Sequence, residues 1–369
     1  MIRVLITGFD GKRAGTESVI MNWYRHIDRN KVQFDFLVDH HLPREFAFSD
    51  EITALGGHIY REYYGRKEDP LHYMQRVMAV LKNDQQIAGV HMNVNDLRYI
   101  TPIKCAKKLN LPIQIIHSHN GGVVAHKGMA RRLLVKSNLN YLKKHEVDLF
   151  ACSKIAGEFM FGSGSNFTII NNGIDVDRYG YRQEWRDTIR SALGIHPGTM
   201  VVGFVGRLNA QKNPKYMIEI FREYYKMNRD SILLVVGVGE LYDECASLAS
   251  NLPVKFLGSR TDVNQFYSAF DLLLLPSLYE GLPLVLMEAQ SAGLKCFVSD
   301  SVSREARVTD LLQFESIHDS PAAWAEKIKK SECSHYERTN RKQDVANAGY
   351  DSIAIAKQLE MFYVNKVEG

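Results

Sequence analysis

The sequence predicts an α/β protein made of two Rossmann-like domains whose parallel sheets face each other across a cleft. Short apolar runs alternate with helical patterns along the chain, a rhythm typical of parallel sheets. This rhythm occupies residues 3–170 and starts again at residue 201. The chain has 369 residues, 45% of them hydrophobic, which is enough for two cores of ordinary size.

Each expected strand is an apolar run of three to five residues. Asn, Gly and Asp cluster between residues 171 and 181, and we place the domain boundary there. We assign residues 1–172 to an N-terminal domain and 173–349 to a C-terminal domain, and we expect a closing helix in 350–369 to complete the first. The expected strands are 3–6, 34–38, 113–116, 149–152 and 167–170 in the first half, and 201–205, 232–236, 254–257, 272–275 and 296–298 in the second.

Charge and composition exclude several classes of protein. The net charge is +4, with 24 Lys and Arg against 18 Asp and Glu in residues 1–180, leaving 22 against 24 in the rest. This excess is small and lacks an aromatic-basic motif, so we expect no nucleic-acid partner. No apolar run approaches the roughly 20 residues of a membrane helix, and the first residues resemble a strand more than a signal peptide. We therefore expect a cytoplasmic protein. Five widely spaced cysteines suggest reduced thiols and no zinc site.

Two acids flank a glycine turn in the second half of the chain. Glu280 and Glu288 lie around the Gly281-Leu282-Pro283 turn, which follows the expected strand 272–275 and opens a helix. Free N–H groups at a helix start attract phosphate, and Pro283 suits the first helical turn. Carboxylates beside them can accept hydrogen bonds from sugar hydroxyls. The sequence thus predicts a site for a sugar nucleotide.

Two cations occupy the loop after an earlier strand. Arg207 and Lys212 follow the strand 201–205, and Asn213 and Pro214 suit the N-cap and first position of the next helix. A guanidinium and an ammonium can neutralise a diphosphate leaving group. Solvated surface charges would be the ordinary interpretation of such residues, and only the strand, glycine and helix context favours a site. We expect both cations to meet both acids.

With these residues the chain resembles the retaining glycosyltransferases of family 4, also called glycosyl transferases group 1, which have the GT-B fold. They carry this Arg and Lys, then a Glu, seven residues and a second Glu. The resemblance implies that Arg207 and Lys212 stabilise the departing diphosphate, that Glu280 binds the donor sugar and that Glu288 binds the ribose. It also assigns the amides of Gly281 and Leu282 to the diphosphate, and Arg260 and Val263 to the nucleobase side, where an ordinary loop is an equal alternative.

The resemblance extends to two residues of the first domain. Gly15 follows the first strand and would let the backbone approach the donor, although Ala14 stands where the family has another glycine. An ordinary turn with a helix cap explains the same residues equally well. His119 follows His117 at the end of the strand 113–116, and the resemblance places His119 against the donor sugar as a catalytic residue. The alternative is a structural histidine.

Two further segments bear on partners. Residues 126–144 join Lys and Arg to an apolar face at helical spacing, which suits either an anionic membrane surface or a simple solvated helix. Asp175 and Asp177 form an acid-x-acid string that other transferases use for a metal. We interpret it as structural, because it lies in the connector and because Arg207 and Lys212 supply the positive charge, so no metal or other cofactor is predicted.

The predicted function is a retaining, metal-independent glycosyltransferase that moves a hexose from a nucleotide sugar, expected to be a UDP-sugar, to a glycan or lipid-linked acceptor. The resemblance suggests synthesis of a bacterial surface polysaccharide such as a capsule or exopolysaccharide. Two alternatives stay open. A nucleotide-sugar epimerase of similar architecture would need no acceptor, and a non-catalytic sugar-nucleotide sensor would tolerate loss of His119.

Overall fold

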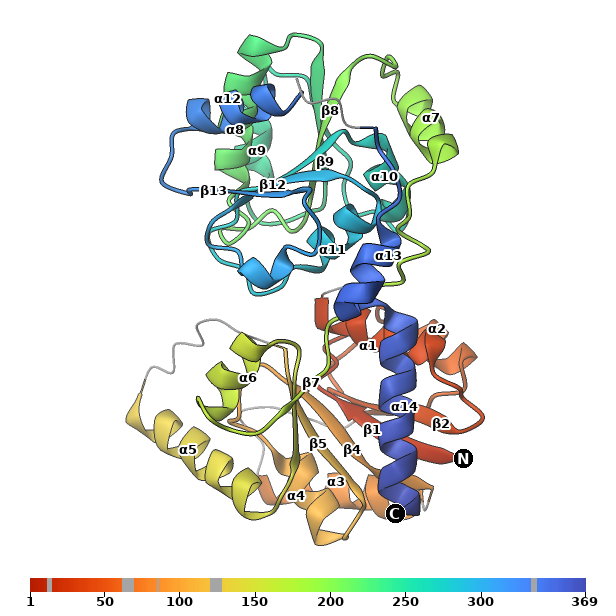
Figure 1. Cartoon of the computed structure of the whole chain (residues 1–369). Coiled ribbons are helices and arrows are strands. Elements are labelled where there is room, and N and C mark those ends of the chain that lie inside the picture. The colour runs from red at the N-terminus through yellow and green to blue at the C-terminus, as the bar shows by residue number, and fades with distance from the viewer. Residues whose placement is uncertain (12–14, 62–69, 85, 120–127, 333–336) are drawn as a thin grey trace. The chain divides into compact units, whose positions relative to one another are not determined.

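The computed structural model describes residues 1–11, 15–61, 70–84, 86–119, 128–332 and 337–369. The chain forms two compact units, the first made of residues 1–173 and 352–369 and the second of residues 174–351. Each unit contains one parallel sheet with helices on both faces (Figure 1). Each is therefore a Rossmann-like α/β layer, as the alternating sequence pattern predicts.

The first unit has a seven-stranded sheet in the order β3-β2-β1-β4-β5-β6-β7. Its order reverses between β1 and β4, so loops on opposite sides of this point diverge. The strands are β1 (Ile2–Thr7), β2 (Val32–Val38), β3 (Ile59–Arg61), β4 (Ile87–Val94), β5 (Ile113–Ser118), β6 (Asp148–Ala151) and β7 (Thr168–Ile169), and the helices are α1 (Gly15–His26), α2 (Ser49–Ala54), α3 (Pro70–Asn83), α4 (Thr101–Lys108), α5 (Met129–Lys144), α6 (Lys154–Phe161) and α14 (Ser352–Glu368).

The second unit has a six-stranded sheet in the order β10-β9-β8-β11-β12-β13. The order reverses between the neighbours β8 and β11, so the loops that follow these two strands both begin at the carboxyl edge of the sheet, at its switch point. The strands are β8 (Met200–Val205), β9 (Ser231–Val236), β10 (Val254–Phe256), β11 (Leu272–Leu275), β12 (Lys295–Ser299) and β13 (Leu312–Glu315), and the helices are α7 (Gln183–Ala192), α8 (Pro214–Met227), α9 (Tyr242–Leu248), α10 (Val263–Ala269), α11 (Leu284–Ser291), η1 (Arg304–Ala306), α12 (Pro321–Glu332), α13 (Lys342–Val345) and η2 (Ala346–Tyr350).

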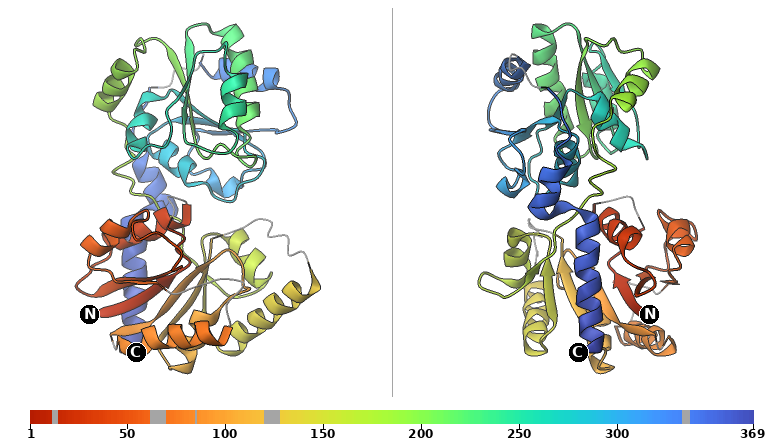
Figure 2. Two further views of the ribbon diagram at one scale, coloured as in Figure 1. Left: turned by 180° about the vertical axis from the view of Figure 1, so that it is seen from behind. Right: turned by 45° about the vertical axis from the view of Figure 1, so that its right-hand side comes forward.

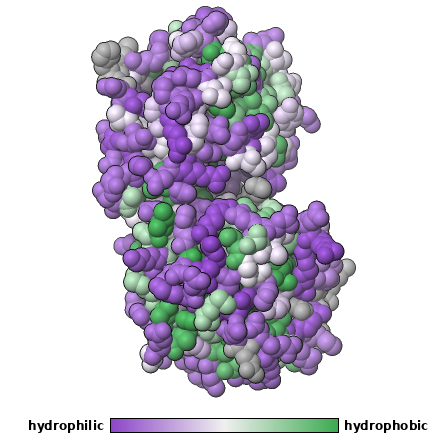
Figure 3. Space-filling model, turned by 90° about the vertical axis from the view of Figure 1, so that its right-hand side faces the viewer, coloured by the Kyte–Doolittle hydropathy of each residue, from purple (hydrophilic) through white to green (hydrophobic). Residues whose placement is uncertain are grey.

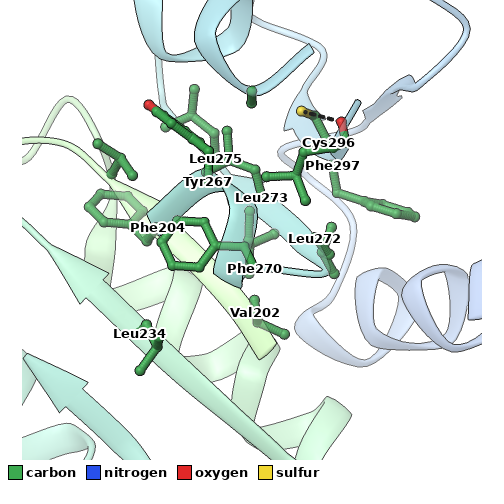
Figure 4. Packing of buried hydrophobic residues seen from close by; sticks show 14 of the residues in the cluster. Val202, Phe204, Leu234, Tyr267, Phe270, Leu272, Leu273, Leu275, Cys296 and Phe297 are labelled. Atoms are coloured by element: carbon green, nitrogen blue, oxygen red, sulfur yellow. Dashed lines mark hydrogen bonds between the residues drawn. The ribbon is translucent and has the colours of Figure 1, made fainter. Parts of the chain in front are cut away.

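The core of the second unit is a continuous apolar cluster around β8, β9, β11 and β12. Figure 4 shows Phe204 and Phe270 in this cluster with Val202 and Leu273 beside them. Gly203 makes this packing possible, because a Cβ on it would lie 2.2 Å from the ring of Phe270. The strands are apolar on both faces, as expected when helices cover a parallel sheet on both sides.

The C-terminal helix α14 packs on the first unit, against α1 (Figures 1 and 2). It buries Ile355, Leu359 and Tyr363 there. The hydroxyl of Tyr363 lies 2.6 Å from Nδ1 of His91 on β4. The last helix of the chain is thus part of the core of the first unit.

Several local predictions differ from the structure. The central strand β4 was not expected, since Gly89, His91 and Asn93 interrupt its apolar pattern. Pro283 is the N-cap of α11 and has an extended backbone, so it precedes the first helical turn. Asn213 is the N-cap of α8 but is left-handed, with φ 52°, and its side chain makes no capping hydrogen bond. Cys105, Cys152, Cys245 and Cys296 are buried free thiols, and Cys333 lies outside the described residues.

The surface is predominantly polar on the face shown in Figure 3, where hydrophobic residues form only small groups. Among the helices that the structure describes, none is both long enough and apolar enough to cross a bilayer.

Candidate functional site

Two neighbouring loops of the second unit build the predicted donor site. The backbone N–H of Leu278, after β11, donates to the carbonyl of Gln211, after β8, at 2.8 Å. The side-chain amide of Gln211 in turn donates to the carbonyl of Tyr279 at 3.1 Å. These bonds connect the loop that carries Lys212 to the loop that carries Glu280.

Lys212 and Glu280 meet where these loops join. Nζ of Lys212 lies 2.6 Å from Oε1 of Glu280, with side chains 15% and 9% exposed. The contact is an ion pair without hydrogen-bond alignment, so Oε1 of Glu280 has no hydrogen-bond partner within the described residues. The close ammonium compensates the charge of this oxygen, and the remaining accepting positions of the carboxylate can receive a ligand hydroxyl. A Cβ on the adjacent Gly281 would meet nothing within 4 Å, so open space lies beside this pair.

Glu288 lies on α11 with two tyrosines around its carboxylate. The hydroxyl of Tyr267 donates to Oε2 at 2.5 Å, and Tyr179 forms a second hydrogen bond. Burial raises the pKa of Glu288, while these bonds and the positive charges of Arg178 and Lys212 act in the opposite direction. A carboxylate has about four accepting positions, so positions for ligand hydroxyls are left over.

Arg207 lies apart from the acids it was expected to meet. Its side chain is 72% exposed, and Nε lies 3.6 Å from Oε2 of Glu240. The reason is local: Arg207 follows β8 closely, and the next residue, Leu208, donates its N–H to the carbonyl of Val238 after β9. Arg207 is thus turned toward β9, whereas Lys212, at the start of α8, reaches the loop after β11. Of the contacts expected between the two cations and the two acids, the structure shows the one between Lys212 and Glu280, while Lys212 acts on Glu288 only electrostatically.

The nucleobase-side residues are engaged with their own neighbours. Arg260 forms a two-point contact with the carboxylate of Asp262, at 2.9 and 2.7 Å, and lies over the ring of Phe266. Val263 begins α10 and packs, partly buried, on the core. The structure therefore adds no support to a ligand role for either residue.

The residues predicted in the first unit lie at two strand ends. Gly15 is the exposed first residue of α1, and a Cβ on it would meet nothing within 4 Å, while Ala14 lies outside the described residues. His119 follows β5 and is partly buried. Its Nε2 lies 2.8 Å from Oδ1 of Asn93, and its Nδ1 lies 3.0 Å from Oδ1 of Asn172.

His119 is the outer member of what we call the histidine stack, formed by His91, His117 and His119 on Trp23. The rings of His117 and His119 are 4.2 Å apart, and Trp23 is nearly parallel to His117 at 5.4 Å. Burial lowers the pKa of His119 to about 4 and that of His91 to about 3, and it lowers the pKa of His117 as well. The imidazoles are therefore neutral at physiological pH.

A separate cavity of about 330 Å³ opens at the carboxyl ends of β1, β2 and β4. It lies at the point where the strand order of the first sheet reverses, which is the usual ligand position in open α/β sheets. Its walls combine carboxylates with aromatic and amide groups. They include Asp10, Asp39, Asn93, Asn95, Tyr73 and Tyr99.

Sequence reasoning missed the residues that surround the predicted ones. Tyr267 and Tyr179 were not assigned to Glu288, and Asn93 and Asn172 were not assigned to His119. Arg178 and Tyr179 lie in residues 171–181, the segment in which the sequence places the domain boundary, so their region was recognisable although their role was not. Tyr267 and Asn93 carried no signal in the sequence, because only the fold brings them to the site.

The chain matches known proteins over both units. Residues 199–331 match the family model described as glycosyl transferases group 1. Bacillus subtilis EpsF, whose name assigns it to the glycosyltransferases, is 29% identical over 350 residues, which are 92% of this chain and 90% of that protein. An Escherichia coli protein named UDP-Gal:alpha-D-GlcNAc-diphosphoundecaprenol alpha-1,3-galactosyltransferase is 36% identical over 140 residues, 36% of each chain.

Solved structures share the fold of the whole chain. Anabaena Alr3699/HepE in complex with UDP has a TM-score of 0.78 at 16% identity, covering 99% of this chain and 100% of that one. WaaG, a glycosyltransferase involved in lipopolysaccharide biosynthesis, has a TM-score of 0.66 at 16% identity, covering 97% and 98%. The fold is thus that of the GT-B glycosyltransferases. The protein is a glycosyltransferase, and its second unit carries the domain of glycosyl transferases group 1, which confirms the resemblance seen in the sequence.

Proposed function

We propose that this protein is a retaining glycosyltransferase that takes a hexose from a UDP-sugar and needs no bound metal. We further propose that its acceptor is a glycan or lipid-linked glycan used in a bacterial surface polysaccharide such as a capsule or exopolysaccharide. The observation that carries the proposal is the Lys212–Glu280 pair, held by the joined loops, with Lys212 close enough to Glu288 to act on its charge. The names of the UDP-galactose-dependent relative and of the UDP-bound neighbour support this donor class.

The donor would bind along the carboxyl edge of β8 and β11. Lys212 and the helix start at Gly281 and Leu282 would hold the diphosphate, and Arg207 would swing from its exposed position to join them. Glu280 would accept from the sugar hydroxyls and Glu288 from the ribose. Positive charge near the diphosphate stabilises the leaving group as the bond to the anomeric carbon breaks.

Retention follows from a front-side reaction in this proposal. The bond from the anomeric carbon to the diphosphate oxygen breaks, and the acceptor oxygen attacks the same face while its proton passes to the departing phosphate oxygen. Glu280 is paired with Lys212, and Glu288 is bonded to tyrosines, so neither carboxylate is presented as a free nucleophile. NMR analysis of the product anomer tests this, and an inverted product would reject it.

Metal independence is proposed because cations of the protein take the place of a divalent ion. Asp175 accepts from the N–H of Arg178 at 3.0 Å, and Asp177 pairs with Lys342 at 2.6 Å, so the acid-x-acid string has structural partners. Turnover should persist in excess EDTA. Loss of turnover in EDTA with recovery on adding Mg²⁺ or Mn²⁺ would contradict the proposal.

The acceptor would enter the cavity at the ends of β1, β2 and β4. Carboxylates such as Asp10 and Asp39 accept hydrogen bonds from sugar hydroxyls, and Tyr73 and Tyr99 supply aromatic surface. This chemistry suits the neutral end of a glycan.

A lipid-linked acceptor would bring the protein to a membrane surface through the described part of residues 126–144. Helix α5 exposes Met129 (78%) and Leu133 (61%) beside Arg132 and Lys136, whereas His126 and Lys127 lie outside the described residues. Apolar side chains with nearby cations bind anionic bilayers. Sedimentation with phosphatidylglycerol vesicles at low salt tests this, and the proposal fails if binding is absent or survives replacement of Arg131, Arg132 and Lys136 by Ala. The matched control replaces three exposed cations of the second unit, Lys215, Lys226 and Lys330.

Thermal shift against UDP, GDP and ADP and their sugars tests the donor class, because a ligand of the native state stabilises it by mass action. We expect the largest shift with UDP compounds. Product analysis then separates the alternatives: a transferase releases UDP only with acceptor or by slow hydrolysis, an epimerase converts the sugar nucleotide itself, and a sensor changes nothing. A flat response to all nucleotides would reject the function.

A further inference from the structure

Asn93 occupies a special position in the first unit, because its side chain lies between the cavity and the histidine stack. It lines the cavity at the end of β4, and it contacts Nε2 of His119 at 2.8 Å. Its own Nδ2 donates to the carbonyl of Thr7 at 3.2 Å. Since that bond uses the amide nitrogen, the oxygen of Asn93 must face His119.

The contact with Asn93 determines where the imidazole proton lies. An amide oxygen can only accept, so Nε2 of His119 carries the proton. A neutral ring then has a lone pair at Nδ1, where the amide of Asn172 lies at 3.0 Å. In the neutral ring that burial favours, Asn172 presents its nitrogen to Nδ1, with the oxygen and nitrogen of this amide exchanged, two atoms that are nearly indistinguishable by shape.

Two neighbouring rings fix the plane of His119. The centroid of His117 lies 4.2 Å from that of His119, and the centroid of Trp23 lies 5.4 Å from that of His117 and 5.9 Å from that of His119. Trp23 is fully buried, so this support cannot move aside without disturbing the core. With both nitrogens engaged and one face covered, His119 has a single tautomer and a single orientation.

We propose that Asn93 is a positioning residue that holds His119 as the neutral, Nε2-protonated tautomer against Trp23 and His117. This inference rests on the proposed function in one respect: as the family resemblance implies, His119 would lie against the donor sugar. A neutral imidazole adds no positive charge beside a sugar that develops positive charge as the leaving group departs. Asn93 would thus keep positive charge off the imidazole next to the reacting sugar, and its side chain would also form part of the wall of the acceptor cavity.

The first test is spectroscopic and needs no variant of Asn93. The thirteen histidines are labelled with ¹⁵N in the full-length protein, and the signals of His119 are assigned by their loss in His119→Gln. We expect two-bond ¹H–¹⁵N spectra to show protonated Nε2 and unprotonated Nδ1 from pH 6 to pH 9. A protonated Nδ1 in a neutral ring, or a charged ring at pH 7, would overturn the proposal.

The second test uses Asn93→Asp, whose carboxylate would favour the imidazolium and raise the pKa of His119 toward its ordinary range or above. Asn95→Asp is the matched control for the spectrum, because it places the same charge in the same cavity two residues away. We expect Asn95→Asp to leave the titration of His119 unchanged. An equal effect of both variants, or no effect of Asn93→Asp, would reject the positioning role.

Steady-state kinetics then separate this inference from the proposed function. Asn93→Asp should lower kcat about tenfold at pH 6 and recover as pH rises through the new pKa of His119, with the donor KM nearly unchanged. If His119 titrates as expected but the pH profile of kcat does not follow it, the inference fails while the donor assignment stands. Should Asn93→Asp fold poorly, the tautomer measured in the protein with native Asn93 still decides the inference.

Discussion

The buried surroundings of Glu288 disfavour the charged form of its carboxylate. Burial raises the pKa of this carboxyl, and the hydroxyls of Tyr267 and Tyr179 counteract the rise by donating to the carboxylate. In the proposed donor site Glu288 would bind the ribose hydroxyls in its charged form, because a protonated carboxyl loses accepting capacity. The tyrosines therefore keep Glu288 competent over a wider range of pH.

The affinity for UDP should consequently fall as pH decreases through the raised pKa of Glu288. Tyr267→Phe removes one donor to the carboxylate, so it should raise this pKa further and move the loss of affinity to higher pH. Isothermal titration of UDP between pH 5 and pH 8 measures both curves. Tyr242→Phe, an exposed tyrosine on α9, is the control. Superimposable curves for wild type and Tyr267→Phe would contradict the role of the hydroxyl.

Replacing Glu288 by Gln should separate stability from function. A carboxyl whose native pKa lies above its unfolded value destabilises the native state at every pH above that unfolded value, because its charged form prefers the unfolded chain. Glu288→Gln removes this cost and still accepts from Tyr267. We expect an unchanged or higher melting temperature at pH 7 together with loss of UDP binding. A clearly lower melting temperature would show that the charge stabilises the fold.

Strand β8 illustrates how an element positions the donor loops. It pairs with β11, and Gly203 brings the strand against the ring of Phe270. Gly203→Ala would place a Cβ 2.2 Å from that ring, and overpacking of this kind costs about 1–3 kcal/mol. Urea unfolding measures the change. Gly198→Ala, where a Cβ meets nothing within 4 Å, is the control, and equal stabilities for both variants would contradict the packing described.

Continuous apolar strands were predictable from sequence, whereas three strands, β3, β4 and β13, were not. The run 272–275 is four leucines and is directly recognisable as a buried strand, as are the runs of β8 and β9. Strand β4 escaped detection because His91 and Asn93 replace apolar residues in a buried position. Those two side chains are satisfied by Tyr363, His117, Thr7 and His119, partners that only the tertiary fold supplies.

The same distinction holds for the candidate site. Spacing predicted the loops that carry Lys212 and Glu280, because both loops follow strands that are clear in the sequence. Spacing could not predict that β8 and β11 are neighbours, which brings Lys212 to Glu280, or that Arg207 turns toward Glu240. The sequence thus predicts which strands are followed by loops with charged residues, whereas the order of the strands in the sheet determines which of these loops come into contact.

At the scale of the whole molecule, the chain leaves the first unit at Gly173 and returns to it at Ser352. Helix α14 therefore completes a unit whose strands all lie much earlier in the sequence. The last of these strands ends at Ile169. Leu359→Ala removes a fully buried side chain from this contact and should cost about 2–5 kcal/mol. Met361→Ala, at an exposed position of the same helix, should cost little.

Fluorescence of Trp23 reports this loss, because Trp23 lies in the first unit while Trp185 and Trp324 lie in the second. Replacing the latter two by Phe isolates the signal during urea unfolding. An unchanged midpoint for Leu359→Ala would show that α14 is dispensable for the first unit.

Lys212, held against Glu280, is proposed to bind the diphosphate of the donor. The most direct measurement is isothermal titration of UDP into the wild-type protein, into Lys212→Ala and into Lys215→Ala, an exposed lysine three residues further on that pairs with Glu244. We expect binding by the wild type and by Lys215→Ala, and a loss of at least about tenfold in affinity for Lys212→Ala, as for removal of a charge-assisted contact of about 1.5–3 kcal/mol. Equal affinities of all three proteins for UDP, or no binding by the wild type, would contradict the account.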